Sequence, residues 1–340
     1  MSGPTVSDQD RVDLDLLLRG FQVSRMLRLV ADLGVADRIA PDDGIAVSQL
    51  ATDSGVLVEP LLRVLRALAA FKIFSVASDG TITHTPRSCL LRTHTPNSLH
   101  HSARFWTAPG SWRAWENLDA AMSGGVPHEA AWNMSRFAYL GEHPEEARIF
   151  DAMMAHFPDN RHAAVAATYD FSTARLIVDV GGGNGAALRH ILEHHPAPRG
   201  LVFDRADVVN AIPDSQLMLG RIDAAGGSFF DCVPAGGDHY LIIRVLHDWG
   251  DEDCLRILRA CRAAMDKNAV LLIGEQILEP DPARGRPSGY LIDVQMMAMF
   301  GAARERTEAE FRDMLAASGF VLRRTIATSS PVWIIEATPA

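Results

Sequence analysis

The run Leu176–Gly185, with the letters LIVDVGGGNG, constrains the fold of this chain more than any other segment. Apolar residues surround Asp179 in a pattern typical of a buried strand, and a glycine-rich turn follows before a helix expected from Ala186. Glycines at such a point let the backbone approach a ligand closely, as at the first strand–helix turn of doubly wound sheets. The segment therefore predicts an open α/β sheet with a ligand site at the end of this strand.

Other apolar runs after residue 170 alternate with amphipathic helices. They predict strands at Leu176–Val180, Gly200–Phe203, Tyr240–Arg244, Val270–Gly274, Val321–Ala327 and Val332–Ala337. Continuously apolar strands separated by helices indicate a parallel sheet that is covered on both faces. Only a short link joins the last two runs, so we expect them to form an antiparallel pair at the end of the sheet.

The N-terminal part of the chain has a different pattern. Apolar residues at helical spacing cover more than one face of residues 11–40, which indicates burial against a neighbour as well as within the domain. Helices at Val47–Ser54 and Glu59–Phe71, followed by β-type runs on either side of Asp79-Gly80, give the outline of a winged helix. We expect a domain over 1–95, a helical segment rich in large side chains over 96–170, and the α/β domain over 171–340.

The overall charge excludes some classes of partner. The 340 residues include 32 Lys and Arg against 42 Asp and Glu, a net charge of −10, which opposes broad attraction to nucleic acid or anionic lipid. No apolar run approaches the roughly 20 residues of a membrane span, and the N-terminus has no apolar signal region. The four scattered cysteines suit reduced thiols, and no metal-ligand spacing stands out. These features predict a cytoplasmic protein with no metal site.

Two acidic residues end neighbouring strands of the predicted sheet. Asp179, directly before the glycines, can hold a cationic or amino-bearing ligand, and Asp204 can accept hydrogen bonds from ribose hydroxyls. Nicotinamide binders also use an acidic residue like the second one. The residues alone therefore leave the identity of the nucleotide cofactor open.

A histidine follows the next apolar strand. In the run Tyr240–Trp249, His247 and Asp248 come just past the carboxyl end of the strand, where ligands bind on open α/β sheets. A histidine there can take a proton from a weak acid such as a phenol, whose pKa lies near 10.

Three motifs in this order, DVGGGNG, then VLHDW followed by GDEDCLRIL, and then ARERTEAEF, resemble those of the small-molecule O-methyltransferases. That family includes plant caffeate and flavonoid enzymes and bacterial enzymes of antibiotic and pigment biosynthesis. The resemblance covers nearly the whole chain and implies an α/β, Rossmann-like class I methyltransferase domain preceded by an all-helical, winged-helix dimerisation domain. It also implies a homodimer whose partners contribute to each other's pockets. The implied cofactor is S-adenosyl-L-methionine, with S-adenosyl-L-homocysteine as its product and no metal.

The resemblance also assigns roles to individual residues. His247 matches the general base, Glu305 the carboxylate that orients it, and Glu336 a second such carboxylate. Many plant members have an acidic residue where this chain has Ser228, and a lysine where it has Ile243. The residues that the resemblance assigns to the cofactor are Asp179, Gly181, Gly183, Asp204, Ser228, Phe229, Arg244 and Trp249.

Large aromatic and methionine side chains suit a planar apolar acceptor that carries a hydroxyl, such as a phenolic or polyketide-like molecule. Three alternatives stay open: a same-fold hydroxylase or decarboxylase, a winged-helix ligand sensor, and a nucleotide-dependent dehydrogenase. The helix at 59–71 has only Arg63 and Arg66 as basic residues, which disfavours a DNA-binding regulator. The residues predicted to line the acceptor site are Phe105, Trp106, Trp112, Phe150, Met154, Met296, Met297 and Phe300.

Overall fold

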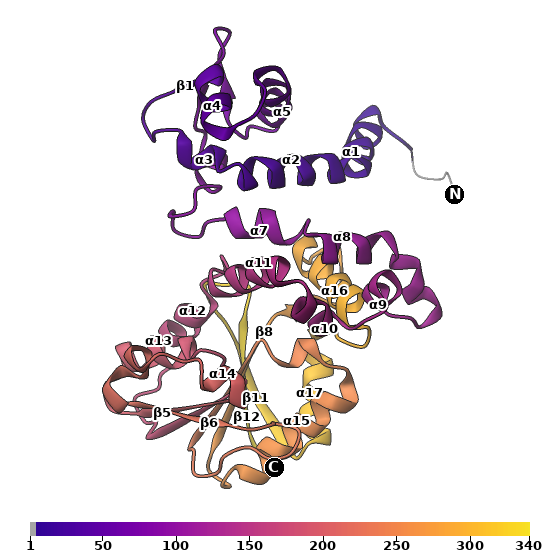
Figure 1. The fold of residues 1–340 in the computed structure, drawn as a ribbon. Helices are drawn as coiled ribbons and strands as arrows, with labels where there is room; N and C mark the ends of the chain where they lie inside the picture. Colours follow the sequence, from indigo (N-terminus) through magenta and orange to yellow (C-terminus); the bar gives the residue numbers. More distant parts are fainter. Residues whose placement is uncertain (1–4) are drawn as a thin grey trace. The chain divides into compact units, whose positions relative to one another are not determined.

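The computed structural model describes residues 5–340, with the side chain of Ala155 left out. It divides into two compact units (Figure 1). The first comprises Met1–Glu116 and Phe137–Pro158, and the second Asn117–Arg136 and Asp159–Ala340. The helical segment expected over 96–170 is thus shared between the two units.

The winged-helix outline predicted from the sequence is present in the first unit. Helix α4 (Val47–Ser54) ends at a glycine in the left-handed conformation, and α5 (Val58–Ala70) follows. Three short antiparallel strands in the order β1-β3-β2 form the wing: β1 (Ile45–Ala46), β2 (Ser75–Val76) and β3 (Thr81–Thr83).

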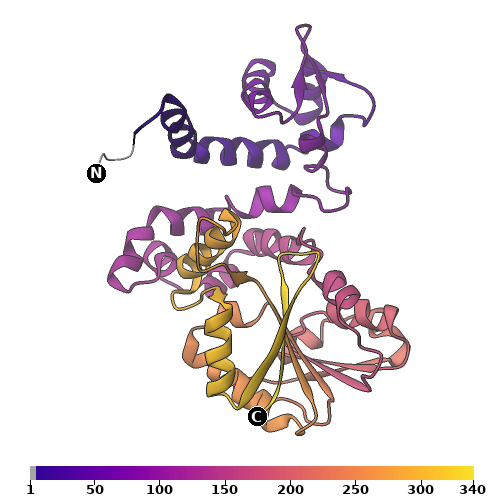
Figure 2. The ribbon, with the colours of Figure 1, turned by 180° about the vertical axis from the view of Figure 1, so that it is seen from behind.

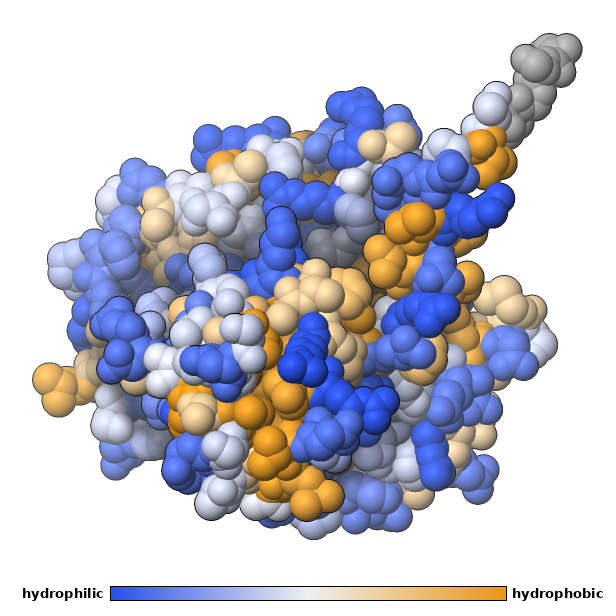
Figure 3. All heavy atoms as spheres, turned by 90° about the horizontal axis from the view of Figure 1, so that it is seen from above, coloured by the Kyte–Doolittle hydropathy of each residue, from blue (hydrophilic) through white to orange (hydrophobic). Residues whose placement is uncertain are grey.

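The N-terminal helices leave apolar side chains exposed. None of the residues of α1 (Asp8–Leu18) is buried, whereas α2 (Gly20–Asp32) and α3 (Val35–Arg38) each bury two residues in the core of the unit. In Figure 3 hydrophobic side chains lie exposed among charged ones close to the N-terminal end. The other helices of this region are α6 (Pro86–Cys89), α7 (His100–Phe105), α8 (Pro109–Glu116), α10 (Arg136–Glu142) and α11 (Pro144–Ala155).

The second unit is built on a seven-stranded sheet in the order β11-β12-β8-β7-β4-β5-β6 (Figures 1 and 2). The strands from β8 to β6 are parallel, and β12 pairs antiparallel with β8 and β11, which confirms the expected antiparallel pair. The strands are β4 (Leu176–Val180), β5 (Arg199–Asp204), β6 (Ile222–Gly226), β7 (His239–Ile243), β8 (Val270–Glu275), β11 (Phe320–Ala327) and β12 (Trp333–Pro339). Strand β6 was not predicted, because this edge strand buries only its first residue fully and so has no continuous apolar run.

Apolar side chains alternate between the two faces of the sheet. One face packs against α12 (Arg161–Thr168), α13 (Ala186–His194) and α14 (Ala206–Val209). The other packs against α15 (Asp251–Ala264) and α17 (Glu308–Ala317). Burial of the parallel strands on both faces explains why they are continuously apolar. The remaining elements are η1 (Leu118–Ser123), α9 (Pro127–Trp132), η2 (Asp214–Gly220), η3 (Leu246–Asp248), β9 (Ile277–Leu278), α16 (Pro287–Phe300) and β10 (Arg306–Thr307).

The chain order of the strands reverses beside β4. From β4 the chain continues to β5 and β6 on one side of the sheet and then crosses to β7 and β8 on the other side. Loops that leave the carboxyl ends of β4 and β7 therefore turn in opposite directions and leave a crevice between them, where open α/β sheets bind ligands. Within the described residues, no helix is long and apolar enough to cross a membrane.

Candidate active site

The glycine turn after β4 excludes side chains by its backbone conformation or by close packing. Gly181, Gly183 and Gly185 have φ values of +73°, +55° and +77°, a region that residues with a Cβ rarely adopt. At Gly182, whose φ is ordinary, an added Cβ would lie 2.6 Å from Oδ2 of Asp179. Glycine is thus required here both for conformation and for close approach.

Asp179 is a buried carboxyl group with an unused oxygen. The residue is 1% exposed, and its Oδ2 has no hydrogen-bond partner within the described chain. Burial, and then the nearby charge of Asp204, raise its pKa to about 7. A buried polar atom without a partner is costly, so the position suits a ligand that brings a positive charge or an N–H group.

Asp204, at the end of β5, faces the same turn. The backbone N–H of Gly183 donates to its Oδ2 at 2.8 Å, and the N–H of Arg205 donates to its Oδ1 at 2.7 Å. The side chain is only partly buried, and each carboxylate oxygen has a second lone pair available for a hydroxyl donor. The arrangement fits the ribose-binding role that the resemblance implies.

Aromatic rings lie beside the turn. A Cβ on Gly181 would come within 3.7 Å of Phe229, and the rings of Phe229 and Phe230 meet Trp249 edge-on, with centroids 6.0 and 4.7 Å apart. Ser228 accepts a hydrogen bond from the N–H of Phe230 at 3.2 Å and so shapes this loop. The structure therefore brings Phe229 and Trp249 next to the glycine turn, where a flat adenine ring could pack.

His247 lies on η3, which follows β7 at the other side of the crevice. Its Nδ1 is 3.1 Å from Oε2 of Glu275, and its Nε2 is 3.1 Å from Oδ1 of Asp248. Burial and the charge of Arg244 lower the pKa of His247, but the two carboxylates outweigh them and raise it to about 9. Burial raises the pKa of Glu275, yet His247 and Arg244 together hold it well below its ordinary value.

The carboxylate at Nδ1 is not one that the sequence suggested. Glu305 instead accepts two hydrogen bonds from Arg244, at 3.0 and 2.7 Å, and Glu336 on β12 pairs with Arg324 at 2.8 Å. The expectation that Glu305 contacts the histidine ring, with Glu336 as a second such carboxylate, is therefore wrong about the contacts. Glu275 carried the same signal that singled out Asp179 and Asp204, an acidic residue that ends an apolar strand.

Arg244, which the resemblance assigns to the cofactor, is held by two buried glutamates. It lies past the end of β7 with a φ of +53°, and its guanidinium is enclosed by Glu275 at 3.0 Å and by Glu305. Burial lowers the pKa of Arg244, but the two glutamates raise it above its ordinary value. Another arginine, half-buried Arg161 at the start of α12, pairs with Asp159 at 2.8 Å and lies within electrostatic range of this group. No sequence signal pointed to it.

The segment after α16 holds the histidine loop in place. The N–H of Arg304 donates to the carbonyl oxygen of His247 at 3.0 Å. Arg306, 1% exposed, donates to the carbonyl oxygens of Leu246 and Trp249 at 3.0 and 2.9 Å and pairs with Asp251. The motifs VLHDW and ARERT, far apart in the chain, therefore form one hydrogen-bonded structure.

Two protein families match this chain. The O-methyltransferase domain matches residues 115–321, and the O-methyltransferase dimerisation domain matches residues 16–94. The chain belongs to the O-methyltransferase family. The sequence-based prediction of an S-adenosylmethionine-dependent O-methyltransferase with an N-terminal dimerisation domain and a Rossmann-like domain is thereby confirmed.

Individual relatives agree with this assignment. The phenazine O-methyltransferase PhzM of Lysobacter antibioticus is 37% identical over 95% of this chain and 94% of its own length. The 3-amino-4-hydroxybenzoate 4-O-methyltransferase of Streptomyces cremeus is 35% identical over 90% of this chain and 84% of its own.

Solved structures match as well. LaPhzM superposes with a TM-score of 0.86 at 36% identity, covering 97% of this chain and 99% of its own. CalO1, a methyltransferase of calicheamicin biosynthesis in its S-adenosylhomocysteine-bound form, gives a TM-score of 0.86 at 28% identity, with 99% of this chain and all of its own covered.

The residues expected to line the acceptor site of this O-methyltransferase fall in both units. In the first, Phe105 is in a small buried cluster, with Trp106 and Phe150 packed against it. Trp112 lies beneath the guanidinium of Arg25 at 5.6 Å, and Met154 is 45% exposed. In the second, Met296, Met297 and Phe300 are half-buried on α16, a helix that contacts η3 and hence the His247 loop.

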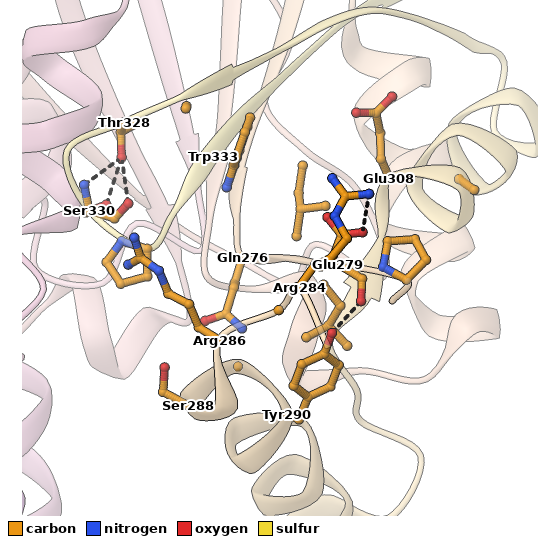
Figure 4. Close-up of a pocket in the computed structure, with 18 residues that line it drawn as sticks. Gln276, Glu279, Arg284, Arg286, Ser288, Tyr290, Glu308, Thr328, Ser330 and Trp333 are labelled. Carbon is orange, nitrogen blue, oxygen red and sulfur yellow. Dashed lines mark hydrogen bonds and ion pairs between the residues drawn. The ribbon is translucent and has the colours of Figure 1, made fainter. Parts of the chain in front are cut away.

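A hollow of about 520 Å³ lies elsewhere in the second unit (Figure 4). Its walls come from the segment after β8, the start of α16, the start of α17 and the β11–β12 turn, and include Gln276, Arg286 and Trp333. Neither the glycine turn nor His247 lines it. The glycine turn and His247 lie at the crevice by β4 and β7, outside this hollow.

Proposed function

We propose that this O-methyltransferase methylates a hydroxyl oxygen of a small aromatic metabolite and that His247 is the general base. The observation that carries the proposal is the 3.1 Å contact between Nδ1 of His247 and buried Glu275, at the switch point of the sheet. A planar aromatic acceptor is supported by relatives named for a phenazine and for an aminohydroxybenzoate. Half-buried Met296, Met297 and Phe300 on α16 suit such a molecule.

The residues at the glycine turn fit S-adenosylmethionine. Asp179 offers an unpaired buried oxygen to an ammonium group, Asp204 has free lone pairs for ribose hydroxyls, and Phe229 with Trp249 offers aromatic faces and edges to adenine. The cofactor, when bound, supplies a methyl group on a positively charged sulfur that needs no further activation.

The task left to the protein is to position and deprotonate the acceptor. Nε2 of His247 takes the hydroxyl proton, which converts a poor nucleophile into a good one. Glu275 at Nδ1 fixes the tautomer of the ring and stabilises the imidazolium that forms. Glu305 acts on His247 only indirectly: it accepts hydrogen bonds from Arg244, and Arg244 in turn pairs with Glu275.

His247→Ala tests the base directly. We expect turnover of a hydroxylated aromatic acceptor with labelled methyl donor to fall about 10²–10⁴-fold, the usual contribution of general-base catalysis. Calorimetric titration with S-adenosylhomocysteine should give nearly the same affinity in both proteins, with NAD as a control ligand that does not bind. Near-normal turnover in the variant would reject the base. A decarboxylated or hydroxylated product would instead favour the same-fold alternative chemistry.

We also infer that two copies associate through the dimerisation domain to form a homodimer. Support comes from its exposed apolar side chains, with Leu17 77%, Leu18 70% and Phe21 55% exposed, on helices that bury little within their own chain. Light scattering at micromolar concentration should give twice the chain mass, and paired Leu17→Lys and Leu18→Lys substitutions should halve it. A monomeric parent protein would reject both the dimer and a shared acceptor pocket.

A further inference from the structure

Both ring nitrogens of His247 face carboxylates. Glu275 lies 3.1 Å from Nδ1, and Asp248 lies 3.1 Å from Nε2. A histidine whose two nitrogens both carry hydrogens has no lone pair with which to accept a proton. Since Glu275 holds Nδ1, the nitrogen left for an acceptor hydroxyl is Nε2, and in this structure that nitrogen already has a partner.

The two carboxylates are held very differently. Glu275 is fully buried, paired with Arg244, and accepts hydrogen bonds from the N–H groups of Val245 and Leu246 at 3.0 and 2.9 Å. The side chain of Asp248 is 38% exposed, and within the described chain its carboxylate contacts no partner other than His247. Asp248 can therefore rotate into solvent at little cost, whereas Glu275 cannot leave.

We propose that Asp248 is a positioning residue that occupies Nε2 of His247 in the free enzyme and turns aside when the acceptor hydroxyl takes its place. The proposal rests on the proposed role of His247 as the base. When Asp248 turns away from Nε2, the histidine loses a proton and changes from an imidazolium into a neutral base.

Protons balance through this exchange. The imidazolium loses its Nε2 proton to water as Asp248 leaves, and the neutral ring then takes one proton from the acceptor hydroxyl. The oxygen–methyl bond forms as the sulfur–methyl bond breaks, and no oxidant or other reactant is needed.

The charges around the ring agree with this order of events. With both carboxylates in place the pKa of His247 is raised to about 9, so the free enzyme holds the ring protonated at neutral pH. Arg244 and burial oppose this shift, so the loss of Asp248 removes one of the two named carboxylates that raise the pKa of His247. The charged residues on the elements around the ring are Asp248 on η3, Arg244 after β7, Glu275 on β8, Asp293 on α16, Arg304 and Glu305 after α16, and Arg161 on α12.

Asp248→Asn tests the proposal, because it keeps the shape of the side chain and removes its charge. The pH profile of kcat/KM reports the free enzyme, so its acidic limb should lie near pH 9 in the parent protein and at least about one pH unit lower in the variant. At pH 7 the variant should then gain roughly tenfold in kcat/KM for the same acceptor, since each unit of pKa is a factor of ten in the neutral ring. Asp253→Asn, which changes an exposed acid on α15, is the matched control and should leave the limb in place.

Titration of the histidine by NMR separates this proposal from the proposed function. In the full-length ligand-free protein with labelled histidines, the His247 signal, assigned by its loss in His247→Asn, should titrate near pH 9 and move down in Asp248→Asn. An unmoved signal, or an unmoved acidic limb, overturns the proposal. If the signal moves but His247→Ala retains its turnover, the contact between Asp248 and His247 exists, and the proposed role of His247 as the base is wrong. An Asp248→Asn protein that loses rate equally at every pH would show an ordinary acceptor-binding role instead.

Discussion

The two sides of the crevice handle charge in opposite ways. At the glycine turn, Asp179 is buried with one oxygen unsatisfied, and the charge that raises its pKa further is that of another acid, Asp204. At the histidine loop, Arg244 is bracketed by Glu275 and Glu305, and every charge has a partner. The first side lacks a cation that a ligand can bring. At the histidine loop the charges already compensate one another, so a ligand that binds Nε2 of His247 must displace Asp248.

The difference separates two ways of preparing a site. An unsatisfied buried acid is costly in the free protein, and that cost is recovered when a cationic ligand binds. In a closed network the buried charges compensate one another at rest, and removal of one member leaves the others uncompensated. Substitutions on the two sides should therefore have opposite effects on stability.

The largest expected effect is at Arg244. Arg244→Met leaves Glu275 and Glu305 buried without a cation, which should lower the free energy of unfolding by about 3–5 kcal/mol. Urea unfolding measures it, and Arg244→Lys should lose less. Arg312→Ala, which breaks an exposed pair with Glu308 on α17, is the control and should change stability little. A small loss of stability in Arg244→Met would mean that the network relaxes or takes up water. The two sides of the crevice would then not differ in how they compensate charge.

Asp179→Asn should act in the opposite direction on stability. The pKa of Asp179 is raised from 3.8 to about 7 in the folded protein, so between those values the folded state binds the extra proton. Stability contributed by this group is therefore present at low pH and is lost as the pH rises towards 7. The variant should flatten this decline and gain roughly 1–3 kcal/mol at pH 8, because a neutral amide avoids the burial of a negative charge beside Asp204.

Cofactor binding supplies the second readout for Asp179. If its free oxygen receives a cationic group, Asp179→Asn should weaken S-adenosylhomocysteine binding at least about tenfold while it stabilises the free protein. Calorimetry on the proteins used for unfolding gives both numbers. A variant that is less stable and binds S-adenosylhomocysteine normally would show that Asp179 is a structural residue. The claim that the glycine turn is prepared for a cationic ligand would then be wrong.

The smallest effect is expected at Glu336. It pairs with Arg324 on the neighbouring strand and is absent from the histidine network, so Glu336→Gln should leave kcat within about twofold. Glu275→Gln, the matched change at Nδ1, should lower kcat at least about tenfold because it disturbs the tautomer and leaves the imidazolium unsupported. Equal losses in both variants would restore Glu336 to the catalytic group.

The sequence by itself determined what belongs at the end of a strand. Asp179, Asp204 and His247 each follow an apolar run, and parallel strands carry their ends to one edge of the sheet, so local pattern was sufficient to select them. The glycine-rich turn could also be predicted from the sequence, because positive φ values or close packing exclude other residues at these positions. The exposed apolar residues of α1 were also expected, because apolar side chains cover more than one face of this part of the sequence.

The tertiary structure alone decided which carboxylate meets the histidine. Strands β7 and β8 pair in parallel with Ile243 opposite Gly274, so the next residues, Arg244 and Glu275, lie side by side. Glu336 is opposite Leu272, three residues short of that end, and cannot reach the loop. Strand order and register are long-range properties that spacing along one chain does not encode. For that reason Glu305, 61 residues from Arg244, could be placed on the arginine only when the fold was known.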